Sequence, residues 1–149
     1  KSSNKKIPTR VNHQLIYGEK ESTSKLFSSI NVSLLNECIY SPTLKTGLTW
    51  GQVLVNKSYE SRLGISFKDN SGISDVVSVD FYTKSGLFKT IKRKLNPNNS
   101  LIFDSVFFKK IKAPNEFVWY FAKSKRSDLQ ADSFHYHKLS GNASGEHSF

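Results

Sequence analysis

Two histidines near the carboxyl end of the sequence have a spacing that could hold a metal ion. His135 and His137 are separated by one residue, so in a β-strand their imidazole rings would lie on the same face. Imidazole nitrogens are common ligands of zinc and related ions, and a third ligand could come from His147 or Glu146. The pattern leaves a divalent-metal site of His135, His137 and His147 open, beside the simpler interpretation that these are surface histidines.

Aromatic residues are the second group whose chemistry could serve binding. The sequence holds eleven Phe, six Tyr and two Trp. An exposed aromatic ring could stack against the C–H face of a sugar or against an unpaired base. We assign Trp50, Tyr59 and Tyr136 to such a ligand-binding surface, whereas the apolar neighbours of Trp119 predict that this residue is buried.

Positive charge is concentrated in one part of the chain. The formal net charge is +10, and residues 84–126 hold eleven Lys or Arg against two acidic residues. Such a region could attract phosphates, acidic sugars or an acidic partner, although lysines also protect exposed sheet edges from aggregation. The basic residues that we assign to ligand binding, with both interpretations open, are Lys92, Arg93, Lys94, Lys123 and Arg126.

No residue pattern predicts catalysis. The single cysteine, Cys38, cannot form an intrachain disulfide and is typical of a small buried apolar group. The sequence contains no glycine-rich phosphate loop, no serine elbow motif and no distinctive pair of carboxylates. We therefore assign no catalytic residue, and we expect no cofactor unless the histidines hold a metal, as they would in a cupin-type enzyme.

The elements that must position these residues are predicted to be β-strands. Residues 59–67 alternate between apolar and polar positions, which is the period of a half-buried strand. Turn residues separate this segment from others of strand character, with 101–108 expected to be a central strand: 29–35, 47–55, 76–83, 88–95, 101–108, 117–122 and 133–139. The spacing predicts an all-β fold, an antiparallel, jelly-roll-like β-sandwich of eight to nine strands with no long helix.

The same pattern predicts the domain boundary and the core. Residues 1–28 are expected to form a basic, polar N-terminal linker or arm with at most one short element, and residues 29–149 a single sandwich domain. Because methionine is absent, we expect the chain to be part of a longer protein, and no segment is apolar enough to span a membrane. The predicted core consists of Leu63, Ile65, Phe67, Val77, Val79, Phe81, Phe103, Phe117, Trp119 and Phe121.

The last quarter of the chain carries a family resemblance. The stretch 117–149, which begins FVWYFAKS at Phe117 and ends SGEHSF at Phe149, resembles the closing segment of β-sandwich modules in bacterial surface-polysaccharide and glycosyltransferase proteins. The resemblance implies a non-catalytic carbohydrate-binding or accessory module associated with bacterial glycan biosynthesis or surface polysaccharide. It transfers no catalytic residue.

Two other functions are open at this point. The basic stretch would suit a domain that binds nucleic acid or another polyanion, and the fold would suit a structural jelly-roll protein of a virion or surface assembly. The expected partners are a glycan or other polyanion and an enzyme domain in the same polypeptide, and homo-oligomerisation is left open. Without disulfides, both the cytoplasm and the bacterial cell surface are compatible locations.

Overall fold

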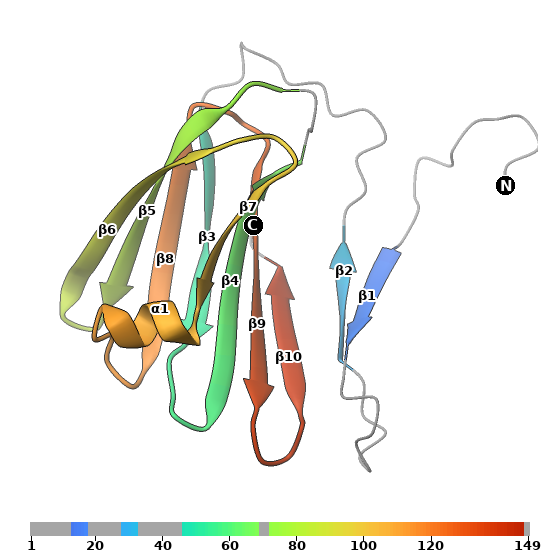
Figure 1. Ribbon diagram of the computed structural model, residues 1–149, viewed down its shortest axis with the longest axis vertical. Helices are drawn as coiled ribbons and strands as arrows, with labels where there is room; N and C mark the ends of the chain where they lie inside the picture. Colours follow the sequence, from blue (N-terminus) through green and yellow to red (C-terminus); the bar gives the residue numbers. More distant parts are fainter. Residues whose placement is uncertain (1–12, 18–27, 33–45, 69–71, 148–149) are drawn as a thin grey trace, which may run out of the picture.

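In the computed structural model of this chain, two antiparallel four-stranded sheets face each other (Figure 1). The structure describes residues 13–17, 28–32, 46–68 and 72–147. One sheet has the strand order β3-β8-β5-β6, and the other has the order β10-β9-β4-β7. The elements of the sandwich are β3 (Gly47–Leu54), β4 (Tyr59–Phe67), β5 (Asp75–Thr83), β6 (Gly86–Leu95), β7 (Ser100–Asp104), α1 (Ser105–Lys110), β8 (Phe117–Ser124), β9 (Leu129–His137) and β10 (Ala143–His147).

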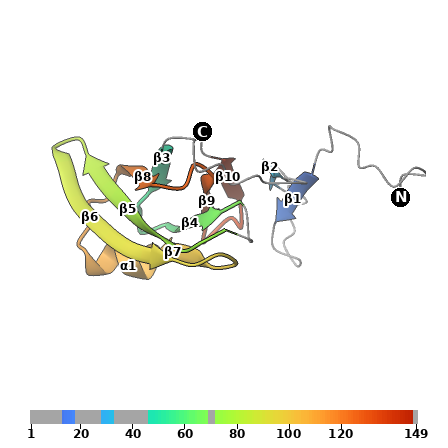
Figure 2. The same ribbon diagram turned by 90° about the horizontal axis from the view of Figure 1, so that it is seen from above.

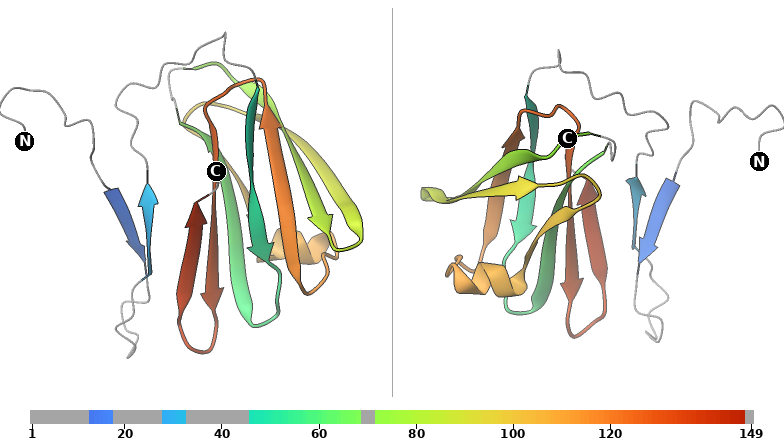
Figure 3. Two further views of the ribbon diagram at one scale, coloured as in Figure 1. Left: turned by 180° about the vertical axis from the view of Figure 1, so that it is seen from behind. Right: turned by 45° about the horizontal axis from the view of Figure 1, so that its top comes forward.

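The connections between these strands confirm the predicted all-β sandwich. Five of the seven connections from β3 to β10 cross between the sheets, and the β5–β6 and β9–β10 hairpins stay within one sheet. Such alternation is typical of double-sheet jelly rolls and can be followed in the two views of Figure 3. Strands that are distant in sequence, such as β3 and β8, therefore become neighbours in one sheet.

A separate two-stranded sheet precedes the sandwich. β1 (His13–Tyr17) pairs with β2 (Ser28–Val32), and β2 lies beside β10. The boundary expected at residue 28 therefore falls at the start of β2, while the two large sheets begin at Gly47. No helix among the residues described above is long and apolar enough to cross a membrane.

The core lies between the two sheets and is built from the inward face of each strand. On β4, every second residue from Ser61 to Phe67 is buried, as the period-two pattern predicted. Removing such apolar side chains from water is the dominant stabilising contribution in a sandwich of this kind. Seven of the predicted core residues are buried: Leu63, Ile65, Phe67, Val77, Val79, Phe81 and Phe103.

The segment 101–108 is not the central strand that its apolar sequence predicted. It forms the edge strand β7 and then most of the short helix α1. The Asp104 carboxylate accepts a hydrogen bond from the Phe107 amide at 2.8 Å and thereby caps the helix. The helical turn buries Phe108 against Phe81, with ring centroids 5.7 Å apart. The prediction was wrong because a short apolar run fits a buried strand and a buried helix equally well.

The face of strand β8 that packs against the core is the opposite of the predicted one. Val118, Tyr120 and Ala122 are buried. Both faces of β8 are apolar, so alternation alone cannot choose between them, and the larger rings were wrongly assigned to the interior. The three residues that the sequence placed in the core are exposed instead: Phe117, Trp119 and Phe121.

Candidate functional site

An exposed aromatic surface covers the outer face of the β3-β8-β5-β6 sheet. Trp50 is 50% exposed, Phe117 44%, Trp119 41% and Phe121 37%, and Tyr82 lies partly exposed beside them. We call these five residues the aromatic face. Of the eleven exposed large hydrophobic side chains in the described part of the chain, seven lie on this side of the sheet: Leu48, Trp50, Val76, Leu87, Phe117, Trp119 and Phe121.

The strand register arranges the aromatic face in rows that run across the strands. Trp50 on β3 pairs with Phe121 on β8, which pairs with Asp80 on β5. In the adjacent row, Trp119 pairs with Tyr82. Outward residues two positions apart on a strand are separated by roughly 7 Å, so large rings of neighbouring rows are close enough to touch. The Tyr82 and Phe121 rings lie edge to face, with centroids 5.5 Å apart at 81°.

Polar groups are interleaved with these rings. Asp80 accepts a hydrogen bond from the Thr90 hydroxyl at 2.7 Å, and its other carboxylate oxygen lies 3.7 Å from the Lys123 ammonium. Gln52 is paired with Trp119 in the β3–β8 register. The surface therefore offers flat apolar rings together with hydrogen-bonding groups that lie in the same rows.

Lysines of the edge strand β6 border this surface on one side. Lys92 pairs with Ser78, and Lys94 pairs with Val76, on the outward-facing positions of β5 and β6. Arg93 points to the other side of β6 and is exposed there, and its guanidinium donates to the Lys92 carbonyl oxygen at 3.1 Å. Of the cations assigned to ligand binding, Lys92, Lys94 and Lys123 thus share the outer side of the sheet with Trp50.

Arg126 does not belong to any exposed basic cluster. Its side chain is 1% exposed and donates to both carboxylate oxygens of Asp128, from Nε at 2.9 Å and from Nη2 at 2.6 Å. Nη1 donates to the Ile73 carbonyl oxygen at 2.6 Å, and the guanidinium lies 4.1 Å from the centre of the Phe67 ring. These contacts give Arg126 a structural role, so it is not available to a ligand at the surface.

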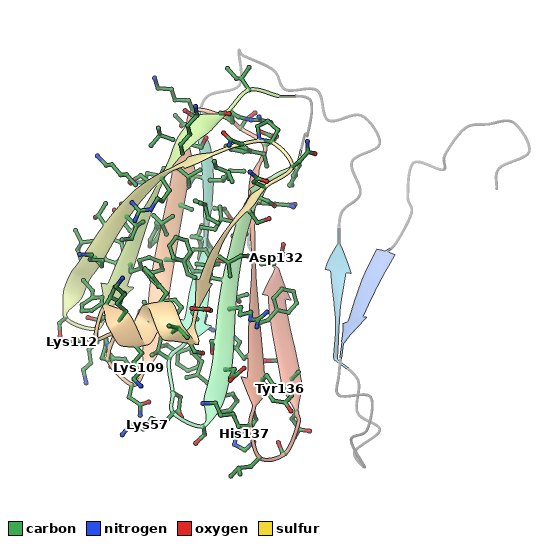
Figure 4. The ribbon with its side chains drawn as sticks, in the orientation of Figure 1. Lys57, Lys109, Lys112, Asp132, Tyr136 and His137 are labelled. Carbon is green, nitrogen blue, oxygen red and sulfur yellow. The ribbon has the colours of Figure 1, made fainter. Side chains whose placement is uncertain are left out.

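The other two aromatic residues assigned to ligand binding lie on the other sheet. Tyr59 and His137 are partners in the β4–β9 register, and their ring centroids are 4.8 Å apart. Tyr136 pairs with Glu60 and Ala143. Figure 4 shows Tyr136 and His137 close to the β9–β10 turn. The structure therefore does not bring Tyr59 or Tyr136 together with Trp50.

The histidine pair lines a recess at this end of the second sheet. The recess has a volume of about 420 Å³ and is lined by Tyr59, His135, His137, Ser140, Asn142, Ala143 and Ser144. His135 is almost fully buried, and its Nδ1 lies 3.1 Å from the Ser61 hydroxyl. Because that hydroxyl donates to the Leu54 carbonyl oxygen, His135 Nδ1 must be the donor to Ser61.

The arrangement of the histidines does not by itself form a metal site. The amide of Ser140 donates to His137 Nδ1 at 3.2 Å, and the Ser140 hydroxyl lies 2.8 Å from the same nitrogen, so only His137 Nε2 could serve as its metal ligand. Within the described residues, no group of three or more His, Cys, Asp or Glu side chains is placed to hold a metal. The side chain of His147 lies outside the described residues, so the three-histidine hypothesis stays a prediction.

One carboxyl group near the end of β5 has a shifted pKa. Partial burial, the largest influence, raises the pKa of Asp75, but hydrogen bonds from the Ser124 hydroxyl and from backbone amides outweigh it and hold the pKa below its ordinary value. The Ser124 hydroxyl and the Lys125 amide each donate to Oδ2 at 2.6 Å. Asp75 therefore ties the start of β5 to the end of β8 and has a structural role.

The sequence did not identify four members of the aromatic face, and one signal could have found three of these four. Phe117, Trp119 and Phe121 share the parity of Lys123 on β8, and a lysine is almost never fully buried without a partner. That parity indicates solvent on their side of the strand. No such signal marks Tyr82, because its position beside the β8 rings depends on the pairing of β5 with β8.

Comparisons of the chain with known protein families, with curated proteins and with solved structures give no match. The geometry of the aromatic face and of its polar neighbours is therefore the basis for any functional conclusion.

Proposed function

We propose that this chain is a non-catalytic carbohydrate-binding module, and that the aromatic face is its glycan-binding surface. The observation that carries the proposal is the exposure of Trp50, Trp119 and Phe121 side by side on one sheet. Contiguous exposed apolar surface is costly in water and typically marks a binding site. The resemblance of the last quarter of the chain to glycan-associated β-sandwich modules points in the same direction.

The chemistry of a sugar ring suits this surface. One face of a pyranose presents several C–H bonds, whose hydrogens carry partial positive charge and are attracted to the electron-rich face of an aromatic ring. Phe117, Trp119 and Phe121 follow one strand over roughly 13 Å, which is long enough to contact more than one sugar ring. Gln52, Asp80 and Thr90 could hydrogen-bond the hydroxyl groups at the edge of the sugar.

An obligate protein interface fits the same surface less well. The centre of such an interface is depleted of charged residues, whereas Asp80 and Lys123 lie in and beside the rows of Trp50 and Phe121. A charged pair among aromatic rings suits a hydroxyl-rich ligand, because each hydroxyl can donate to the carboxylate or accept from the ammonium.

A panel of neutral and acidic oligosaccharides tests the proposal by isothermal titration. We expect the parent chain to bind at least one member, and Trp119→Ala to bind it about tenfold or more weakly, since one aromatic stack contributes about 1–3 kcal/mol when it holds a flat base. Tyr136→Ala is the matched control, because this ring lies on the other sheet. Equal affinity of Trp119→Ala and the parent chain, or no binding to any oligosaccharide, would reject the aromatic face as a glycan site.

Nucleic-acid binding is the second candidate, and the exposed lysines of β6 favour it. Lys89, Lys92 and Lys94 are all exposed on an edge strand, and aromatic rings beside cations also bind single-stranded nucleic acid. Titration with a short single-stranded DNA at about 50 and 200 mM salt separates the two, because phosphate contacts weaken steeply over that range. Tight, salt-sensitive binding of DNA in preference to every oligosaccharide would favour the second candidate.

A further inference from the structure

One end of the aromatic face differs from the other in charge. At the β5 position of Ser78, the register places Lys92 on one side, from β6, and Lys123 on the other, from β8. All three residues lie on the outer side of the sheet, because Val77 and Val79 on either side of Ser78 are buried in the core. Ser78 thus lies between two lysines in a single row.

The spacing of this row suits a small anion. Neighbouring strands are about 4.8 Å apart, so the Cα atoms of Lys92 and Lys123 are separated by roughly 10 Å with the short Ser78 side chain between them. A lysine ammonium group lies at the end of a flexible four-carbon side chain. The ammonium groups of Lys92 and Lys123 could therefore both contact one carboxylate or sulfate over Ser78. The serine hydroxyl could donate a further hydrogen bond to the same group.

The balance of charge around the row is positive. Lys94 extends it beside Val76, so within the described part of the chain three lysines face one nearby carboxylate, that of Asp80. Asp80 is itself held by Thr90 at 2.7 Å and by Lys123 at 3.7 Å. Three ammonium groups and one carboxylate leave two positive charges in excess, so an anion that arrives over Ser78 meets a net positive charge from Lys92, Lys94 and Lys123.

Among the residues that the structure describes, the opposite end of the aromatic face carries no comparable charge. The row that begins at Gln52 continues through Trp119 and Tyr82 to Leu87, and it contains no charged side chain. Farther along, Lys84 is paired with Glu116 at 3.6 Å. A ligand that spans the aromatic face would therefore have an acidic end over Ser78 and an uncharged end over Trp119.

We infer that the ligand of this surface is an acidic glycan, whose carboxylate or sulfate group is held between Lys92 and Lys123 over Ser78 while its sugar rings stack on Phe121 and Trp119. This inference rests on the proposed function and names the class of glycan. The lysines select the acidic sugar over its neutral counterpart, and the rings supply the contact area that is common to both.

The test uses carboxylated and sulfated oligosaccharides, each paired with its own neutral form, the methyl ester or the desulfated sugar. We expect the parent chain to bind at least one acidic member about fivefold or more tightly than its neutral form at low salt, and the difference to shrink as salt screens the charges. The double variant Lys92→Gln/Lys123→Gln should lose about two- to fivefold in affinity for each lysine, the effect of an exposed ion pair, and should bind both forms alike.

The matched control removes the same charge elsewhere. Lys109→Gln/Lys112→Gln changes two exposed lysines on and beside α1 (Figure 4), and α1 packs on the inner side of β5 through Phe107 and Phe108. This control should keep the preference for the acidic sugar. Because all four lysines are exposed, thermal unfolding of both double variants should match that of the parent chain.

The outcomes separate the two proposals. If neutral sugars bind through Trp119 as tightly as acidic ones, or if Lys92→Gln/Lys123→Gln keeps the full preference, the acidic class is wrong and the glycan-binding surface stands. If the Lys109→Gln/Lys112→Gln control loses the preference for the acidic sugar equally, that preference comes from the net charge of the protein. The proposed anion site over Ser78 is then wrong. If no sugar binds, both proposals fail together.

Discussion

Tyr120 and Gly51 face each other in the β3–β8 pair, and a Cβ atom at position 51 would stand only 2.7 Å from the Tyr120 hydroxyl oxygen. The tyrosine side chain therefore occupies space that any larger residue at position 51 would need. Because successive side chains of a strand point to opposite faces, the inward position of Tyr120 forces Trp119 and Phe121 outward. The buried contact between these two strands thus lies directly behind the aromatic surface on the other face of the sheet.

Gly51→Ala should destabilise the fold. The added methyl group would force the Tyr120 side chain or the β3–β8 pair to move, and overpacking of this kind typically costs about 1–3 kcal/mol. The free energy of unfolding in urea measures the effect. Gly64→Ala is the matched control, because its Cβ would meet Ile102 Cδ1 at an ordinary 3.6 Å. Equal losses in the two variants would contradict the close contact at Gly51.

Neighbouring rings on β8 should respond differently to truncation. Tyr120 is buried, so Tyr120→Ala should cost about 3–5 kcal/mol, the usual cost of emptying an aromatic core site. Trp119 is 41% exposed, so Trp119→Ala should cost no more than about half as much and should act mainly on ligand binding. Chemical denaturation of both variants checks the order, and a larger loss for Trp119→Ala would show that Trp119 faces the core.

The Arg126–Asp128 pair should be among the most sensitive polar contacts of the sandwich. Both side chains are almost fully buried, so Asp128→Asn leaves the guanidinium without its counter-charge, which costs on the order of 3 kcal/mol. Lys84→Gln is the control, because the Lys84 side chain is largely exposed and its pair with the half-buried Glu116 should be worth less than about 1 kcal/mol. Comparable losses in urea unfolding would argue against the buried pair.

The stability of the fold should depend on Asp75 in acid. Its folded-state pKa is lowered, so the ionised carboxylate stabilises the fold above the pKa of the unfolded chain, and this contribution is lost as the pH falls through the lower folded-state pKa. Below about pH 5, the parent chain should therefore lose stability faster than Asp75→Asn. Thermal unfolding across this range is the measurement, and parallel pH profiles would show that the hydrogen bonds from Ser124 and Lys125 contribute nothing.

Local alternation was enough to predict the sandwich and much of its core. In 59–67 and 76–83, apolar and polar residues alternate so clearly that the buried side follows from the alternation alone. The view from above shows the resulting two layers, with β5 and β6 extending to one side (Figure 2). Trp50, Lys92 and Lys94, which the sequence assigned to ligand binding, are exposed, and their part in binding stays a prediction.

Only the tertiary structure decided which cations share a surface with the rings, and it settled which face of β8 meets water, a choice for which the sequence offered only the parity of Lys123. Both sides of β8 are apolar, and the side that meets the core carries Tyr120, whose ring fits against Gly51 of another strand. The sequence assigned Arg126, like Lys123, to an exposed ligand-binding surface. Arg126 is buried instead, and Asp128, the Ile73 carbonyl and the Phe67 ring offset the cost of burying its charge. Such outcomes depend on pairings between distant strands, and the period of a single strand contains no information about the residues that will lie across from it.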